Sequence, residues 1–369
     1  MANHVGDRDP AGKRNRRPRL IKVLLLLLSV GTALLGAELG LRGFGFSYHL
    51  YPERIEFATL KTPRATDCFE PDPDLLWVPK RPGPYGKKLA MLRRLRPTVV
   101  FMGCSCTQLG SYPKRFADLI EKAEPGRRPV VANVGVIGWS SFQGLQQLGR
   151  DVLPITPKVI VIYYGWNDHW IGLGIEEKEA WRINQPWSSL LQRLRIAQLS
   201  TKAYVALRGG VRERHPNRVS PRDFASNLRE MVRLARQNGI EPVLVTAPSS
   251  HEMLDDLSAV AHLEGMWLRR LADLVPLHRQ YAEVVRQVAA GERVVLCDLL
   301  KEFSSFPKER VVNEFFTGDG IHLTDAGNQQ IALCLFRCFK ENKLVEGILP
   351  PASSQPHAPN AARRLSGTR

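Results

Sequence analysis

Short apolar runs alternate with amphipathic stretches along most of this chain of 369 residues. The apolar runs have the length and composition of strands covered on both faces of a sheet, and they lie at residues 98–102, 130–133, 158–164, 242–246 and 293–297. The amphipathic stretches have the spacing of helices, and they lie at residues 112–123, 141–153, 221–238, 262–290 and 324–342. This alternation predicts a three-layer α/β/α domain around a five-stranded parallel sheet with right-handed crossovers.

Polar residues with complementary chemistry occur next to these runs. Ser105 follows the first predicted strand, Asn167 follows the third, and Asp319 precedes His322 by three residues. A serine hydroxyl is a weak nucleophile until a base takes its proton, an imidazole base needs a carboxylate to fix its tautomer, and an oxyanion needs positioned donors. Because the carboxyl ends of parallel strands meet at one edge of a sheet, these residues predict an acyl-transfer site there.

The same segments, in the same order, resemble the sequence blocks of the SGNH hydrolases, also called GDSL-type esterases and lipases. The resemblance covers roughly residues 98 to 340, and the blocks that carry it are Gly103-Cys104-Ser105, residues 133–138, Gly165-Trp166-Asn167-Asp168 and Asp319-Gly320-Ile321-His322. It implies a flavodoxin-like α/β fold and an esterase that needs no cofactor and no metal.

The resemblance also implies a role for each matching residue. Ser105 would be the nucleophile, His322 the base and Asp319 its carboxylate partner. The oxyanion hole would consist of the backbone N–H groups of Ser105 and Gly138 and the side-chain amide of Asn167. Beside this last residue, Trp166 and His169 are expected to contact the substrate, whereas Asp168 is expected to accept hydrogen bonds from the backbone.

Cysteine stands where the family usually has aspartate, at position 104, and a second cysteine follows at 106. Either thiol is a rival nucleophile. Side chains alternate along an extended backbone, so residues 104 and 106 are expected to point away from the face that carries Ser105. A disulfide between them would be strained.

The N-terminus has the features of a membrane-inserted segment. Residues 1–22 carry seven basic and two acidic side chains, and the uncharged apolar run 23–37 follows directly. We interpret residues 1–19 as a basic cytoplasmic segment and 20–42 as a transmembrane signal-anchor, with the catalytic domain outside the cytoplasm, in a bacterial periplasm. A cleaved signal peptide is the alternative, although Leu35 occupies a position where cleavage prefers a small residue.

Composition bounds the rest of the chain. The net charge of +16 is concentrated partly at the N-terminus, so the basic balance indicates a membrane surface rather than nucleic acid. Residues 43–96 are rich in proline and show little periodicity, and we interpret them as a juxtamembrane connector that partly wraps the catalytic domain at 97–345. Residues 346–369 have the composition of a disordered tail, and the insertion at 169–217 is placed to cover the site or to pack on the domain.

The six cysteines form no pattern with zinc-ligand spacing. Cys334 and Cys338 lie four residues apart in a predicted helix and are expected to be small core residues. An oxidising compartment would permit a disulfide, for instance with Cys68, but the sequence does not give the connectivity.

Three functions fit these observations. The first is a serine esterase that acts on an ester-containing small molecule, a lipid or a carbohydrate. The second is an O-acyltransferase that modifies a cell-envelope glycan, and the third is a catalytically inactive, membrane-anchored binding module. The acyl group, the alcohol and the oligomeric state are not encoded in any motif of the sequence.

Overall fold

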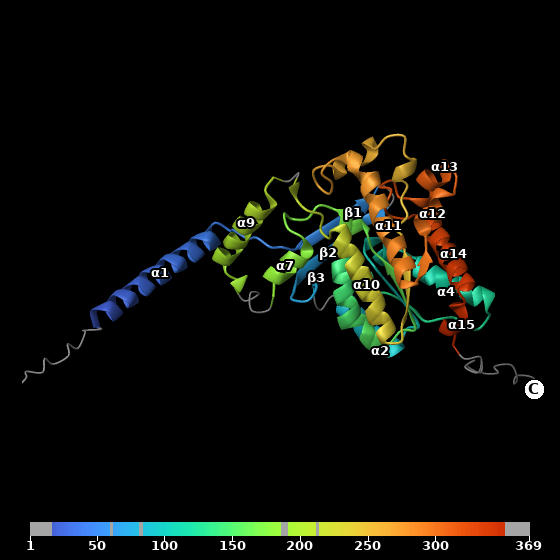
Figure 1. Cartoon of the computed structure of the whole chain (residues 1–369), viewed down its shortest axis with the longest axis horizontal. Helices are drawn as coiled ribbons and strands as arrows, with labels where there is room; N and C mark the ends of the chain where they lie inside the picture. Colours follow the sequence, from blue (N-terminus) through green and yellow to red (C-terminus); the bar gives the residue numbers. More distant parts are fainter. Residues whose placement is uncertain (1–16, 60–61, 81–83, 186–190, 212–213, 351–369) are drawn as a thin grey trace, which may run out of the picture. The chain divides into compact units, whose positions relative to one another are not determined.

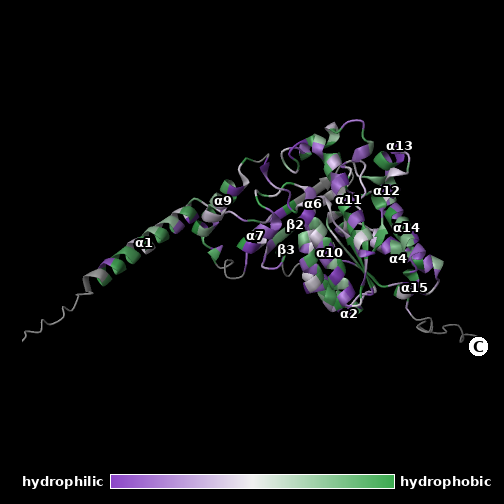
Figure 2. Cartoon of the chain, viewed as in Figure 1, coloured by the Kyte–Doolittle hydropathy of each residue, from purple (hydrophilic) through white to green (hydrophobic). Residues whose placement is uncertain are grey.

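The computed structural model describes residues 17–59, 62–80, 84–185, 191–211 and 214–350 (Figure 1). The chain divides into two compact units: Met1–Tyr48 with Leu190–Ala203, and His49–Ser189 with Tyr204–Arg369. In the first unit, α1 (Arg17–Gly43) contains an apolar segment, Leu20–Gly43, that is long enough to cross a membrane. Figure 2 shows its hydrophobic character along most of the helix. A signal sequence has the same length and composition, so α1 is compatible with an anchor and with a leader.

The second unit is built on a parallel sheet of five strands. Their order across the sheet is β5-β4-β6-β7-β8. The strands are β4 (Val99–Gly103), β5 (Val131–Asn133), β6 (Val159–Tyr163), β7 (Glu241–Val245) and β8 (Val295–Cys297). All neighbouring pairs are parallel, which confirms the α/β fold predicted from the five apolar runs.

Helices cover both faces of this sheet. Val100 and Met102 belong to one hydrophobic cluster and Val99 and Phe101 to another, as the alternation of side chains along a strand requires. The first cluster is completed by residues of α5 (Ser141–Gln147), α10 (Pro221–Gln237) and α11 (Leu274–Glu292). The second is completed by residues of α4 (Tyr112–Ala123), α12 (Leu299–Ser304) and α14 (Asp325–Glu341). Both faces are therefore buried, which explains why the strands are continuously apolar.

Two predicted helices differ from the observed ones. The helix expected at 141–153 is α5 followed by a π-helical turn, Leu148–Val152, and a short 3-10 turn, Leu153–Ile155. The helix expected at 262–290 begins only at Leu274, because Pro276 lacks an N–H and fits only the first turn of a helix. The residues before it form the short turns η5 (Ser258–Leu263) and η6 (Leu271–Asp273).

The remaining elements are short or lie outside the main sheet. They are α3 (Ser105–Gln108), α6 (Trp166–His169), α7 (Glu177–Ile183), α9 (Arg195–Gly209), η4 (His251–Met253), α13 (Lys308–Arg310), η7 (Val311–Phe315) and α15 (Val345–Ile348). The beginning of the expected tail is folded, since Ile348 is buried and the carbonyl of Pro350 accepts from Arg127. Residues 351–369 lie outside the described residues.

The segment expected to be an irregular connector is largely regular. It forms the antiparallel sheet β1 (Arg54–Thr59), β2 (Thr62–Asp72) and β3 (Leu76–Pro79), followed by α2 (Pro84–Leu95). Its prolines interrupt the alternation of apolar and polar residues, so the sequence pattern does not indicate strands. The strands form nevertheless, since proline is tolerated at strand ends and on edge strands.

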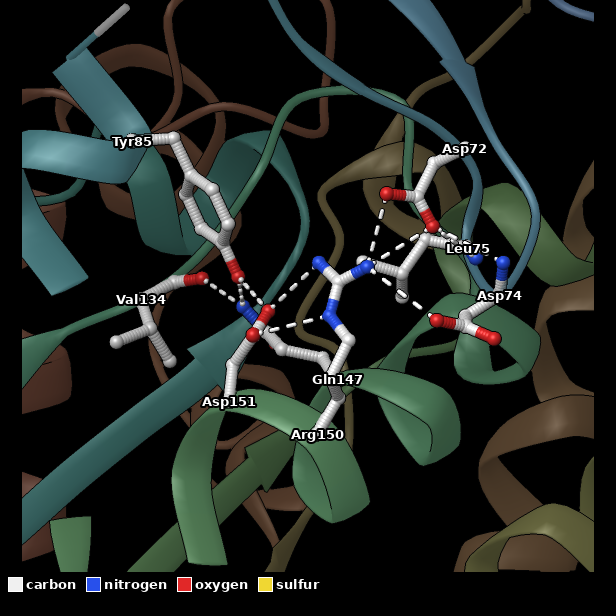
Figure 3. A network of polar contacts seen from close by, with 8 residues as sticks. All are labelled: Asp72, Asp74, Leu75, Tyr85, Val134, Gln147, Arg150 and Asp151. Atoms are coloured by element: carbon white, nitrogen blue, oxygen red, sulfur yellow. Dashed lines mark hydrogen bonds and ion pairs between the residues drawn. The ribbon is translucent and has the colours of Figure 1, made fainter. Parts of the chain in front are cut away.

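A polar network fastens this segment to the main domain (Figure 3). The guanidinium of Arg150 donates to both oxygens of Asp72, at 2.9 and 2.8 Å, and pairs with Asp151 at 3.0 Å. The hydroxyl of Tyr85 donates to Asp151 at 2.9 Å, so α2 joins the same network. The turn after β2 and the helix α2 are thereby attached to the π-helical turn that contains Arg150.

One disulfide joins β8 to α14, between Cys297 and Cys338. The expectation that Cys338 is a simple core residue is therefore wrong, and Cys68 is not its partner. The two bonded cysteines are 41 positions apart in the sequence, and only the packing of α14 against β8 brings them together.

Candidate active site

A hydroxyl, an imidazole and a carboxylate from distant parts of the sequence meet at the carboxyl edge of the sheet. The Oγ atom of Ser105 lies 2.8 Å from Nε2 of His322. Nδ1 of the same ring lies 2.6 Å from Oδ2 of Asp319. The order hydroxyl, imidazole, carboxylate is the one that lets an imidazole accept a proton from a serine while the carboxylate fixes its orientation.

Backbone groups hold the carboxylate of Asp319 in place. Its Oδ1 atom accepts from the N–H groups of Ile321 at 2.9 Å and His322 at 2.8 Å. Burial alone would raise the pKa of Asp319, but these bonds and the bond to the His322 ring outweigh burial and hold the pKa below its usual value. Asp319 is therefore charged at neutral pH and can stabilise a positive charge on the imidazole.

A second histidine, His251, contacts the backbone of Asp319. Nε2 of His251 lies 2.8 Å from the carbonyl oxygen of Asp319, and Nδ1 lies 3.0 Å from Oγ of Ser249. The ring is buried and also packs edge-on against Trp166. His251 is therefore placed to support the backbone of Asp319.

Ser105 is the first residue of α3 and follows β4 after a single residue. Cys104 and Cys106, on either side of it, are 1% and 3% exposed and neither is among the described residues that line the cavity. Hydrogen bonding to the Cys106 side chain lowers the pKa of the Cys104 thiol below its usual range. Ser105 therefore differs from the two cysteines in its access to the cavity rather than in acidity, since of the three side chains only that of Ser105 lines the cavity.

Gly138 and Asn167 lie on the cavity wall with Ser105. Gly138 has a φ of +78°, in the left-handed region, and a Cβ atom there would lie 2.6 Å from Cδ1 of Ile55. The side-chain amide of Asn167 donates one N–H to the carbonyl of Trp139 at 2.9 Å. This bond fixes the direction of the amide, which carries a second N–H.

A buried ion pair holds the loop that contains Gly138. The guanidinium of Arg218 donates to the carbonyl of Gly138 at 2.6 Å and to Oε1 of Glu177 at 2.7 Å. Their side chains are only 11% and 8% exposed. Ser140 donates to the other carboxylate oxygen of Glu177. The loop is thus tied to α7 and to the segment before α10, two places that carry no family motif.

The cavity beside these residues has a volume of about 650 Å³, within the usual range of small-molecule sites. Its wall is mostly apolar. Among the described residues, four indole rings contribute to it, those of Trp77, Trp166, Trp170 and Trp267. The segment after α1 contributes a further group, His49, Leu50, Tyr51, Pro52, Arg54 and Ile55.

Of the two residues expected to contact the substrate, one lines the cavity and the other does not. Trp166 lines the cavity and stacks on the ring of His278. His169 is fully buried, and it is not among the described residues that line the cavity. Burial lowers the pKa of His169 well below its usual value, so its ring is neutral and acts as packing against Trp170. Asp168 accepts from the backbone N–H groups of Ser141 and Gly165, as expected.

Sequence reasoning missed the contribution of residues 49–52, 54 and 55 and of Trp77, Arg218 and Trp267. The expectation that a site forms at the carboxyl ends of parallel strands singles out residues that directly follow such strands. None of the missed residues directly follows one. The cluster of aromatic residues in the proline-rich segment was the available signal. In the described part of the chain, no group of three or more His, Cys, Asp or Glu side chains is arranged to hold a metal ion.

The chain thus carries a serine, a histidine and an aspartate within hydrogen-bonding distance of one another at the carboxyl edge of a parallel α/β sheet. The chain belongs to the GDSL-like lipase/acylhydrolase family, whose model matches residues 100–330. This membership confirms the resemblance drawn from the four sequence blocks.

Several solved structures are similar to this chain. The lipase/acylhydrolase from Enterococcus faecalis is 18% identical, with a TM-score of 0.43 over 69% of this chain and 97% of that one. A GDSL-like lipase from Bacteroides thetaiotaomicron is 16% identical, with a TM-score of 0.42 over 72% and 98%. An acetylxylan esterase from Geobacillus stearothermophilus is 15% identical, with a TM-score of 0.41 over 66% and 93%. No curated protein matches the sequence.

Proposed function

We propose that the chain is a membrane-anchored serine esterase that hydrolyses an acyl ester through a covalent acyl-enzyme. The observation that carries the proposal is the pair of contacts at the cavity wall, Ser105 Oγ to His322 Nε2 at 2.8 Å and His322 Nδ1 to Asp319 Oδ2 at 2.6 Å. Membership of an acylhydrolase family supports the same chemistry.

The first half of the reaction forms the acyl-enzyme. Oγ of Ser105 attacks the ester carbonyl carbon while Nε2 of His322 takes the hydroxyl proton. The negative oxygen of the tetrahedral intermediate accepts from the backbone N–H groups of Ser105 and Gly138 and from the Asn167 amide. As the C–O bond of the ester breaks, the imidazolium returns its proton to the departing alkoxide, and the alcohol leaves.

The second half regenerates the serine. Water enters, gives a proton to His322 and attacks the acyl carbon, and the Ser105 oxygen leaves with the proton that the imidazolium carries. The apolar wall of the cavity favours an ester with a hydrophobic portion, because contact with the four indole rings removes apolar surface from water. An alcohol acceptor in place of water would make the same site an acyltransferase.

The anchor part of the proposal places α1 across a bilayer with the N-terminus in the cytoplasm. Its apolar segment of 24 residues spans about 36 Å at 1.5 Å per residue, enough for a hydrocarbon core of about 30 Å. The basic residues before it favour this orientation. The disulfide between Cys297 and Cys338 supports a catalytic domain in an oxidising compartment.

Covalent labelling tests the enzyme and its nucleophile together. The full chain, solubilised in a mild detergent, is treated with a fluorescent fluorophosphonate and assayed for hydrolysis of a p-nitrophenyl ester. The unsubstituted chain is expected to be labelled and active. Ser105→Ala is expected to lose the label and to lose at least about 10³-fold in kcat, because the nucleophile carries the reaction.

Matched controls separate the nucleophile from general damage. Ser305→Ala removes a hydroxyl from an exposed surface serine and is expected to keep both label and activity. Labelling that persists in Ser105→Ala but disappears in Cys104→Ala or Cys106→Ala would overturn the assignment. Product analysis with an added glycan acceptor distinguishes transfer from hydrolysis, since an acylated glycan in place of free acid would make transfer the main activity.

A further inference from the structure

The helix α9 carries its apolar residues on the outside. Its buried positions, Gln198, Thr201, Val205 and Gly209, recur every three or four residues and define the inner face. On the opposite face, Leu199 is 44% exposed and Leu207 is 86% exposed. That face also carries Ala203, Ala206 and Ser200, whose hydroxyl donates to the carbonyl of Ile196. A surface helix of a soluble protein normally turns polar residues to this side, so the exposed face of α9 is suited to an apolar environment.

Direct contacts attach the beginning of α9 to the end of α1. The backbone N–H of Ile196 donates to Oε2 of Glu38 at 3.1 Å, and Oε1 of Glu38 accepts from Arg42 at 2.7 Å. Arg42 also donates to the carbonyl of Arg193 at 3.2 Å. Glu38 is only 8% exposed, although the residues around it in α1 are mostly apolar and exposed. A carboxylate in such a helix is costly unless it is paired, and α9 provides one of its partners.

The length of α1 sets the depth of this junction. Leu20 begins the apolar segment, and Glu38 follows it by 18 residues, about 27 Å along the helix axis at 1.5 Å per residue. A hydrocarbon core is about 30 Å thick. If the apolar segment crosses the bilayer, Glu38 and Arg42 lie at the far boundary of the core, and the first turn of α9 lies at the same level.

The charges of α9 fit the headgroup layer. Residues 191–211 contain four basic side chains, Arg193, Arg195, Lys202 and Arg208, and no acidic one among the residues described there. Lys202 also lies 5.6 Å from the ring centroid of Phe46, just after α1. Basic side chains flanking an exposed apolar face are the signature of a helix that lies in the plane of a membrane interface and is attracted by anionic lipids.

We infer that α9 is an interfacial membrane helix, a second attachment to the bilayer beside α1. Leu199, Ala203 and Leu207 face the acyl chains, and the lysine and arginine side chains reach the phosphates. The occupant of the apolar face is the surface of a bilayer that contains anionic phospholipid. The inference rests on the proposal that α1 spans the membrane, and it is independent of the proposed esterase chemistry.

Photo-cross-linking in vesicles measures where α9 lies. A photoreactive side chain is introduced at Leu199 or Leu207 of the full chain, which is reconstituted into vesicles of phosphatidylglycerol and phosphatidylcholine and irradiated. Leu28, in α1, is the positive control, and Leu333, a leucine of α14 that is 40% exposed, is the matched surface control. Mass spectrometry counts the lipid adducts at each position.

The expected result is lipid adducts at positions 199 and 207 at no less than about one third of the yield at 28 and at least about ten-fold above the yield at 333. Lys202→Glu with Arg208→Glu is expected to lower the yield at 207 several-fold without changing the yield at 28, because it removes the attraction to the phosphates. The circular dichroism and the urea unfolding midpoint of each variant, compared with those of the unsubstituted chain, report whether the variant is folded.

Three outcomes would overturn the inference. A yield at 207 no greater than at 333, with abundant adducts at 28, would place α9 in water. Adducts to a protein at 207 would show that a polypeptide covers the face. Absence of lipid adducts at 28 would remove the anchor and, with it, the placement of α9. None of these readouts depends on catalysis, so a failure of the esterase proposal is recognised separately by labelling of Ser105.

Discussion

Replacement of Arg218 by methionine is expected to slow the enzyme by more than its effect on stability can explain. The guanidinium donates to the carbonyl of Gly138 at 2.6 Å, and a hydrogen bond of this charged kind contributes about 1.5–3 kcal/mol. If that energy holds the Gly138 loop in the conformation that receives the oxyanion, its loss lowers kcat/KM by about ten-fold to a hundred-fold. Removal of an oxyanion donor altogether sets the upper limit, about 10²–10³-fold.

The same substitution also destabilises the fold. Arg218→Met leaves the carboxylate of Glu177 buried without its cation, at a cost of about 3–5 kcal/mol. The double variant Arg218→Met/Glu177→Gln removes the unpaired charge, so it is expected to recover part of the stability. It is not expected to recover the rate, because the Gly138 carbonyl still lacks its donor.

Arg150→Met is the matched control for this experiment. Arg150 forms a comparable network with Asp72 and Asp151 (Figure 3), and its side chain is 27% exposed. The hydrogen bonds that its guanidinium donates go to these two carboxylates and not to the Gly138 loop. Its loss is expected to lower the unfolding free energy by a similar amount and to leave kcat/KM per active site within about two-fold. Activity on a soluble p-nitrophenyl ester, divided by the fluorophosphonate-titrated site concentration, measures the rates. Equal rate losses in the two variants would refute the role of Arg218 in positioning the loop.

Three further predictions concern stability and the support of the site. Burial lowers the pKa of His278 to about 3, below the value near 6.5 of an unfolded chain, so the stability that it contributes is complete above pH 6.5 and is lost as the pH falls through that window. We expect urea unfolding to show a loss of about 2 kcal/mol between pH 7 and pH 5, smaller in His278→Gln; equal losses in the two proteins would contradict the assignment. Cys338→Ser removes the disulfide that closes a loop between residues 41 positions apart, and it is expected to lower the unfolding free energy by about 4 kcal/mol. The urea midpoint measures this loss. An unchanged midpoint under non-reducing conditions would argue that the bond with Cys297 does not form. Gly320 has a φ of +69°, and in Gly320→Ala a Cβ atom would lie 2.4 Å from the ring of His251. We therefore expect kcat to fall at least about ten-fold while fluorophosphonate still binds. Full activity would show that the turn of Asp319 and Gly320 can shift without displacing His322.

Local pattern was sufficient for the main sheet and for the polar residues on its edge. All five apolar runs are strands, and the helix at 112–123 has the predicted bounds, because strand and helix periods are written in neighbouring residues. Ser105, Asp319 and His322 could be proposed as partners because their chemistry is complementary, because Ser105 follows a predicted strand and because Asp319 precedes His322 by three residues. The antiparallel sheet at 54–79 could not be predicted in the same way, since its prolines break the alternation.

What the sequence determined by itself is therefore the order of elements and the chemistry offered at the ends of the strands. Only the tertiary structure decided which distant segments meet. These meetings are the cavity wall formed by residues 49–52, 54 and 55, the ion pair of Arg218 with Glu177, the disulfide of Cys297 with Cys338, and the attachment of α9 to α1. The physical reason is that periodicity reports the environment of each residue along its own element, whereas these contacts depend on which surfaces meet when the elements pack. That choice is made by the shape and charge of both partners, and no window of the sequence contains both.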